Sequence, residues 1–274
     1  MSFIPQREKP KLKKVIIIFV IMYLGIASTL YFLQDNILFR PTVLAKDFEY
    51  KFSYPFEELF LNPEEGVVIN ALHFTNIKPK GVILYFHGNA GDLSRWGKIM
   101  EYFVQLNYDV LVMDYRTYGK STGALSQEGL YRDAQFCYDY LKKSYPEEYI
   151  TVYGRSLGTT FAAFVASKNN PKQIILETPY YSMSDVAKLR FPLLPTKYLL
   201  KYKLPTYSFM NKIDCNILIL HGSEDKVIKI SSAEKLFEVA PENQTTFIAI
   251  EGASHNDLIN FEEYHNAIKD LLLQ

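Results

Sequence analysis

"VYGRSLGTT", residues 152–160, is the stretch that decides the fold of this 274-residue chain. A β-rich run precedes it and a run of small residues follows it, and its one serine, Ser156, stands between Gly154 and Gly158. This G-x-S-x-G pattern is typical of a sharp strand-to-helix turn that exposes a nucleophilic hydroxyl, because glycines at both flanks let the strand and the helix approach closely. The alternative is that Ser156 only caps the N-terminus of a helix. Residues elsewhere in the chain distinguish between these two interpretations.

The rest of the chain alternates between strand and helix patterns. Helical patterns occupy 94–107, 126–144, 157–168, 231–240 and 256–273, and eight segments read as strands: 56–62, 67–74, 81–88, 108–114, 149–154, 173–177, 216–222 and 245–252. Strands that alternate with helices predict an α/β fold with a mostly parallel eight-stranded sheet and helices on both faces. Three prolines interrupt this rhythm between 180 and 212, which indicates a small cap insertion in a catalytic domain spanning 34–274.

The N-terminal segment has the length and composition of a membrane span. Val15 to Leu33 contains no charge, and nineteen helical residues rise roughly 28 Å, about the hydrocarbon thickness of a bilayer. Basic residues dominate 1–14, so we expect a cytoplasmic N-terminus, a single transmembrane helix over 15–33 and an extracytoplasmic catalytic domain. The alternative is a cleaved signal peptide, because Gly25-Ile26-Ala27 has a small-x-small pattern after an apolar run.

Composition excludes several other classes of function. The formal net charge is zero, so nothing predicts a nucleic-acid partner. Cys137 and Cys215 have no metal-ligand spacing, and we predict two free thiols, no metal and no cofactor. The sequence leaves the oligomeric state open.

A serine nucleophile on such a turn needs an acid and a histidine further along the chain, in the order Ser, acid, His. His255 lies in the loop "EGASHND", directly after a predicted strand, where its imidazole can reach the edge of the sheet. Asp225 lies in "HGSEDKVI", in the loop after the preceding strand, with Glu224 as its possible substitute. His221 ends a strand, and we expect it to be structural.

An oxyanion hole would complete the site. The glycine-rich "FHGNAGD", residues 86–92, follows the strand at 81–88 and points to the backbone N–H of Asn89 as one donor. The second donor is expected from Leu157, the residue after the nucleophile. All these residues fall at the carboxyl ends of predicted parallel strands, where chemistry gathers in open α/β sheets, and this coincidence argues against the helix-cap reading of Ser156.

With these motifs assembled, the chain resembles α/β-hydrolases, and specifically the membrane-anchored Bem46-like and serine aminopeptidase-type hydrolases. The resemblance covers roughly residues 33–260 and rests on "LQDNILFRPT", "YFHGNAGDLSRW", "DYRTYGKSTG", "YGRSLGTTFA", "LETPYYSM", "NILILHGSEDKVI" and "GASHND". It implies Ser156 as nucleophile, Asp225 as acid, His255 as base, and Asn89 and Leu157 as the oxyanion hole. Thr117 departs from the family pattern, which has glycine in "DYRGYG".

We therefore expect hydrolysis of an ester or thioester of an acyl or lipid-like substrate through an acyl-enzyme. The cap residues Phe191, Leu194 and Tyr198 are candidates for an apolar substrate pocket. Two alternatives stay open. The same triad could cleave amides or peptides, with Glu177 recognising a peptide amine, or the chain could be a non-catalytic membrane-bound scaffold.

Overall fold

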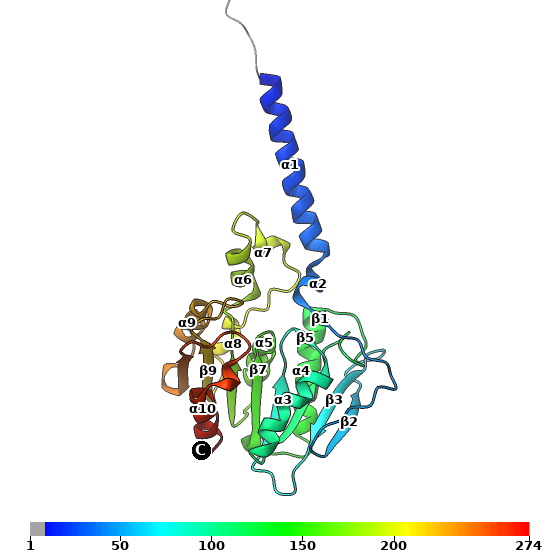
Figure 1. Cartoon of the computed structure of the whole chain (residues 1–274), viewed down its shortest axis with the longest axis vertical. Coiled ribbons are helices and arrows are strands. Elements are labelled where there is room, and N and C mark those ends of the chain that lie inside the picture. The colour runs from blue at the N-terminus through cyan, green and yellow to red at the C-terminus, as the bar shows by residue number, and fades with distance from the viewer. Residues whose placement is uncertain (1–8, 274) are drawn as a thin grey trace, which may run out of the picture.

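An eight-stranded sheet forms the centre of the computed structural model, which describes residues 9–273 (Figure 1). Its strands are β2 (Phe56–Leu61), β3 (Ile69–Phe74), β4 (Val82–Phe86), β6 (Asp109–Met113), β7 (Ile150–Arg155), β8 (Gln173–Glu177), β9 (Asn216–Gly222) and β10 (Thr245–Ile250). They lie in the order β10-β9-β8-β7-β4-β6-β3-β2, and every neighbouring pair is parallel except the two pairs made by β3. The predicted mostly parallel sheet of eight strands is confirmed.

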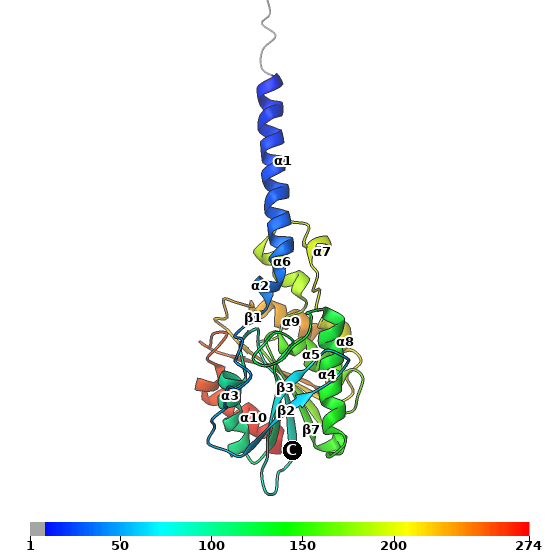
Figure 2. The same ribbon diagram turned by 90° about the vertical axis from the view of Figure 1, so that its right-hand side faces the viewer.

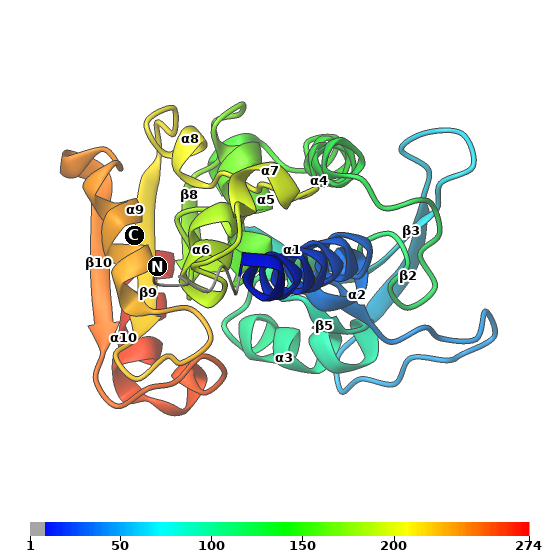
Figure 3. The same cartoon turned by 90° about the horizontal axis from the view of Figure 1, so that it is seen from above.

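Helices cover both faces of this sheet, as predicted (Figure 3). One apolar core lies under α3 (Leu93–Gln105) and α10 (Glu262–Leu273). The other lies under α4 (Gln127–Leu141), α5 (Gly158–Ala166), α8 (Tyr207–Met210) and α9 (Ile230–Glu238). The central strands β3, β4, β6, β7 and β8 are buried along their whole length, which explains their continuous apolar runs.

The C-terminal helix is shorter than the sequence predicts. It begins at Glu262 and not near 256, because the chain after β10 first forms a loop and a 3-10 turn, η3 (Leu258–Asn260). Asp257 belongs to this loop: its carboxylate accepts hydrogen bonds from the backbone N–H (2.6 Å) and the hydroxyl (2.7 Å) of Ser254. The loop matters for the site because it carries His255.

The N-terminal helix stands away from the sheet. Helix α1 (Lys9–Phe32) projects beyond the carboxyl ends of the strands, and α2 (Gln34–Leu38) leads from it into the domain (Figure 2). Among the described residues, one helix is long and apolar enough to cross a membrane, over Leu12–Phe32, and little of it is buried. The predicted basic segment 1–14 lies partly outside the described residues. After α2, the short strand β1 (Arg40–Pro41) pairs with β5 (Ala90–Gly91).

The segment predicted to form a cap leaves the sheet after β8 and rejoins it at β9. It contains α6 (Met183–Arg190), α7 (Thr196–Leu199) and α8, and α6 and α7 lie beside the lower part of α1 (Figure 1). This segment and the two N-terminal helices therefore stand together over the carboxyl edge of the sheet.

Thr117, the departure from the family pattern, keeps the backbone that glycine would adopt. Its φ is 74°, and the turn around it closes with a hydrogen bond from the N–H of Tyr118 to the carbonyl of Tyr115 (2.9 Å). A left-handed conformation costs a β-branched residue about 1–2 kcal/mol. The turn is preserved at that cost, and no candidate catalytic group is displaced.

Candidate active site

Ser156 sits on a sharp turn between β7 and α5. Its φ is 51°, in the left-handed region, and its backbone N–H donates to the carbonyl of Glu177 on the neighbouring strand (2.9 Å). A Cβ at Gly154 would lie 2.6 Å from the carbonyl oxygen of Gly158, and one at Gly158 would overlap the carbonyl of Phe86. The two glycines are therefore required by the close approach of strand and helix, as the G-x-S-x-G pattern indicates.

One imidazole joins Ser156 to Asp225. His255 Nε2 lies 3.0 Å from Ser156 Oγ, and His255 Nδ1 lies 2.6 Å from Asp225 Oδ2. A carboxylate can only accept, so Nδ1 carries the proton and Nε2 is left to accept from the serine hydroxyl. The structure thus brings together three residues from loops after β7, β9 and β10.

Asp225 is held by more than His255. Its Oδ1 accepts from the backbone N–H groups of Val227 (2.8 Å) and Ile228 (2.9 Å), and His221 Nε2 lies 3.3 Å from its Oδ2. Burial alone would raise the pKa of Asp225, but the hydrogen bonds from His221, His255 and the backbone outweigh it and hold the pKa well below its usual range. Asp225 is therefore ionised at neutral pH.

His221 contacts the acid directly, and sequence reasoning missed this. Because Nε2 also lies 2.9 Å from the carbonyl of Ile228, which can only accept, Nε2 is its protonated nitrogen. The available signal was its spacing: His221 stands four residues before Asp225, at the end of a strand whose following loop turns back on itself.

The two expected oxyanion donors lie beside Ser156. Asn89 and Leu157 line the same cavity as Ser156. Asn89 is anchored on three sides: its side chain donates to the carbonyl of Leu38 (3.0 Å), and its carbonyl accepts from the N–H of Arg40 (2.9 Å) and the hydroxyl of Tyr118 (2.7 Å). Within residues 9–273, neither the backbone N–H of Asn89 nor that of Leu157 donates to another protein group.

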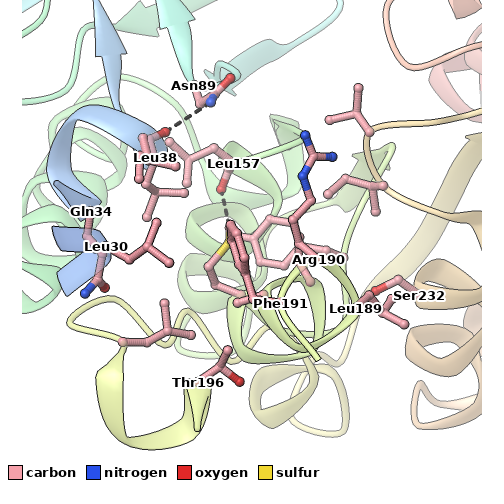
Figure 4. A pocket seen from close by; sticks show the side chains of 18 of the residues that line it. Leu30, Gln34, Leu38, Asn89, Leu157, Leu189, Arg190, Phe191, Thr196 and Ser232 are labelled. Carbon is pink, nitrogen blue, oxygen red and sulfur yellow. Dashed lines mark hydrogen bonds between the residues drawn. The ribbon is translucent and has the colours of Figure 1, made fainter. Parts of the chain in front are cut away.

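A cavity of about 530 Å³ opens over Ser156. Figure 4 shows its two walls: Leu30, Gln34 and Leu38 come from the N-terminal helices, and Leu189, Arg190 and Phe191 come from the cap. Of the predicted pocket residues, Phe191 and Leu194 line it. Tyr198 does not line it, and its side chain is 81 % exposed.

The wall formed by α1 and α2 was missed by sequence reasoning, which assigns 15–33 to a membrane span and expects pocket residues in the cap. Gln34 fixes this wall to the cap, because its side chain donates to the carbonyl of Leu199 (2.7 Å) and accepts from the N–H of Lys201 (2.9 Å). A local sequence pattern cannot predict a contact between residues that are 165 positions apart.

Glu177 is not available to a substrate. It is buried, its carboxylate lies 3.2 Å from Arg155 Nε, and it accepts from the hydroxyl of Tyr153 (2.7 Å). It also does not line the cavity over Ser156. Glu177 is therefore paired with other residues and is not placed to bind the amine of a peptide substrate. Over the described part of the chain, no group of three His, Cys, Asp or Glu side chains could hold a metal ion.

Comparison with known proteins shows the family of this chain. A family profile described as serine aminopeptidase, S33, matches residues 77–216, half of the chain. The α/β-hydrolase domain-containing protein 17B of Xenopus laevis is 31 % identical over 71 % of this chain and 67 % of its own length. This chain belongs to the α/β-hydrolase family. The predicted resemblance to α/β-hydrolases is confirmed.

Two further similar proteins match most of the length of this chain. The uncharacterized protein R595 of Acanthamoeba polyphaga mimivirus is 29 % identical over 94 % of this chain and 98 % of its own length. The esterase Pf2001 of Pyrococcus furiosus superposes with a TM-score of 0.70 at 18 % identity, over 86 % of this chain and 97 % of that one. At that identity the second likeness establishes the shared α/β-hydrolase fold alone. The family match identifies the chain as a hydrolase.

Proposed function

We propose that this α/β-hydrolase is a membrane-anchored serine hydrolase that cleaves acyl esters or thioesters. The observation that carries the proposal is the position of His255, which lies within hydrogen-bond distance of both Ser156 Oγ and the Asp225 carboxylate. An imidazole oriented by an ionised carboxylate and adjacent to a serine hydroxyl is the arrangement that activates serine as a nucleophile.

The reaction would proceed through an acyl-enzyme. His255 Nε2 takes the proton of Ser156 as Oγ bonds to the carbonyl carbon of the substrate, and Asp225 stabilises the charged imidazole. The tetrahedral intermediate then collapses: the bond to the leaving alcohol or thiol breaks, and that group takes the proton from His255. Water, deprotonated by His255, then bonds to the acyl carbon. The bond from that carbon to Oγ breaks, Oγ takes the proton back from His255, and the acyl group leaves as a carboxylic acid. The backbone N–H groups of Asn89 and Leu157 would hold the oxyanion, and each such donor typically contributes 10²–10³ in rate.

The cavity favours an acyl substrate. Its walls are mostly aliphatic and aromatic, with Met183, Val186, Phe191 and Leu194 on the cap side and Leu30 and Ile37 on the side of the N-terminal helices. A volume of about 530 Å³ lies in the ordinary range for small-molecule sites. The fold shared with a solved esterase supports the same reaction class.

Amide or peptide hydrolysis is the second candidate, favoured by the printed description of the matching family, serine aminopeptidase. An enzyme that selects peptide N-termini needs a carboxylate for the ammonium group. Among the described residues, those that line the cavity include Arg40, Arg190, Lys226 and Lys229 but neither Asp nor Glu. This charge distribution disfavours a cationic substrate and supports the ester or thioester proposal.

The membrane part of the proposal rests on α1. Its apolar stretch over Leu12–Phe32 is long enough to span a bilayer, and the basic residues before it favour a cytoplasmic N-terminus with the catalytic domain on the other side. The alternative, a cleaved signal peptide, makes a different prediction. Intact-mass measurement of the protein isolated from whole cells and medium would find the first thirty or so residues missing if the segment were cleaved.

Labelling with a fluorophosphonate probe tests the catalytic proposal. We expect the full-length wild type to label and Ser156→Ala not to label. A panel of nitrophenyl esters, acyl thioesters and aminoacyl amides then separates the two candidate reactions. Equal labelling of wild type and Ser156→Ala would support a non-catalytic scaffold and overturn the proposal.

A further inference from the structure

The cap touches α1 far from the end of that helix. We call residues 191–194, which join α6 to α7, the cap tip. The hydroxyl of Tyr23 donates to the carbonyl of Leu193 (3.0 Å), and Tyr23 lies nine residues before α1 ends at Phe32. At 1.5 Å per residue, the cap tip stands roughly 14 Å along α1 from its C-terminal end.

This contact constrains where a bilayer can lie. A transmembrane helix needs about 20 apolar residues to cross a hydrocarbon layer of roughly 30 Å. If the bilayer began beyond the cap tip, only 15–22 of the uncharged stretch would remain, rising roughly 12 Å. The span cannot be extended toward the N-terminus, because Lys9, Lys11, Lys13 and Lys14 precede it. A bilayer spanned by α1 therefore also reaches the cap tip.

The surface of the cap suits this position. Leu193 is 87 % exposed, and Phe191 and Leu189 are also exposed, so the protein leaves this apolar group uncovered. Arg190 and Lys197 flank the tip, and their long side chains can extend to the headgroups while their stems stay in apolar surroundings.

The charged surface lies lower, at the foot of α1. Lys201 Nζ lies 3.6 Å from Asp35 and 5.2 Å from the ring centre of Tyr31, next to Gln34. A belt of charged and aromatic side chains is typical of the membrane–water interface. The charged residues Asp35 and Lys201 thus lie at the C-terminal end of α1, where its membrane span begins, and the apolar cap tip lies further along the helix.

From these observations we infer that the cap tip inserts into the bilayer beside α1, so that the cavity over Ser156 takes an acyl chain laterally from the membrane. One wall of that cavity is α1 and α2 and the other is the cap (Figure 4). The inference rests on the proposed function for the anchor and the reaction, and it adds the partner, a lipid bilayer, and the substrate class, an acyl ester or thioester already resident in it.

Depth-dependent quenching tests the insertion without relying on catalysis. Full-length protein in vesicles of phosphatidylcholine brominated on its acyl chains would carry an environment-sensitive fluorophore at Leu193→Cys or at Ile77→Cys. Ile77 is the matched control, because it is fully exposed in the loop before β4, at the opposite edge of the sheet. Both proteins would also carry Cys215→Ser, because Cys215 is partly exposed and could react with the fluorophore. Cys137 can stay, because it is buried. We expect at least about twofold stronger quenching at position 193, and equal quenching at the two positions overturns the insertion.

An activity measurement tests the lateral route. Leu193 lies outside the cavity lining, so we expect Leu193→Asp to lower hydrolysis of a long-chain lipid ester in vesicles roughly tenfold while changing turnover of a soluble short-chain nitrophenyl ester less than about twofold. Ile77→Asp should change neither. Equal loss on both substrates overturns the route. Vesicle flotation and fluorophosphonate labelling of the wild type report on the anchor and the triad separately, so failure of the proposed function is recognised by itself.

Discussion

The catalytic edge of the sheet and the walls of the cavity above it are built in opposite ways. Ser156, Asp225 and His255 each follow a strand of one sheet, and close backbone packing and hydrogen bonds hold the first two. The cavity walls come from the N-terminal helices and the cap, which meet through a few bonds made by Gln34 and Tyr23. The difference teaches that the candidate reacting groups are held by one sheet, whereas the walls above them come from distant segments that meet through few contacts.

The largest effect should come from the base. His255→Ala removes the group that accepts the Ser156 proton, so we expect kcat to fall by about 10⁴–10⁶ with the thermal unfolding temperature nearly unchanged. Steady-state kinetics on a soluble ester give the measurement. His265→Ala is the matched control, because His265 lies on α10 and bonds only Tyr102 among the described contacts. A comparable loss in the control would break the contrast between the two regions.

The next effect should be on stability. Gly158→Ala places a methyl group against the carbonyl of Phe86, where backbone surrounds it, so we expect a loss of about 3 kcal/mol in the free energy of unfolding. Gly25→Ala adds the same methyl group to α1 with nothing within 4 Å, and it should cost nothing measurable. Urea unfolding of both variants in detergent micelles makes the comparison. An undamaged Gly158→Ala protein would show that the elbow is not rigid.

A smaller effect should come from the missed histidine. His221→Phe removes one hydrogen bond from Asp225, so kcat should fall about tenfold, and the pKa of Asp225 should rise toward its usual value. A lowered folded-state pKa stabilises the fold above the unfolded value of about 3.9 and loses that contribution below it. The variant should therefore be less stable than wild type at pH 7, and the difference should shrink as the pH falls through 4. Unfolding free energies of both proteins at several pH values test this. A difference that does not depend on pH would mean that His221 contributes packing alone and does not stabilise the ionised Asp225.

The smallest effect should come from the joint between the two cavity walls. Gln34→Ala removes the two hydrogen bonds that its side chain makes to the cap, so we expect KM for a lipid ester to rise a few-fold with kcat unchanged, because Gln34 does not contact the candidate triad. Gln135→Ala, which removes an equal amide from the surface of α4, serves as control. A loss in kcat at Gln34 would mean that the walls and the sheet edge are coupled.

Much of the sheet edge could be predicted because its signals are local. The glycines around Ser156 and the loops that carry Asp225 and His255 each indicate the end of a strand. The fold allows one chain order for nucleophile, acid and histidine. The cavity walls could not be predicted in the same way. Leu30, Gln34 and Ile37 lie in N-terminal segments whose apolar residues predict burial or a membrane but not which segment they face.

By itself, therefore, the sequence determined the α/β fold and the candidates for nucleophile, base and acid, since strand periodicity and turn glycines act over a few residues. Only the tertiary structure decided that Glu177 pairs with Arg155, that His221 reaches Asp225, and that α1 forms one wall of the cavity. These contacts join residues that are distant in the chain or whose side chains could equally have faced elsewhere. Such choices are made by packing as the whole domain closes, not by any short stretch of residues.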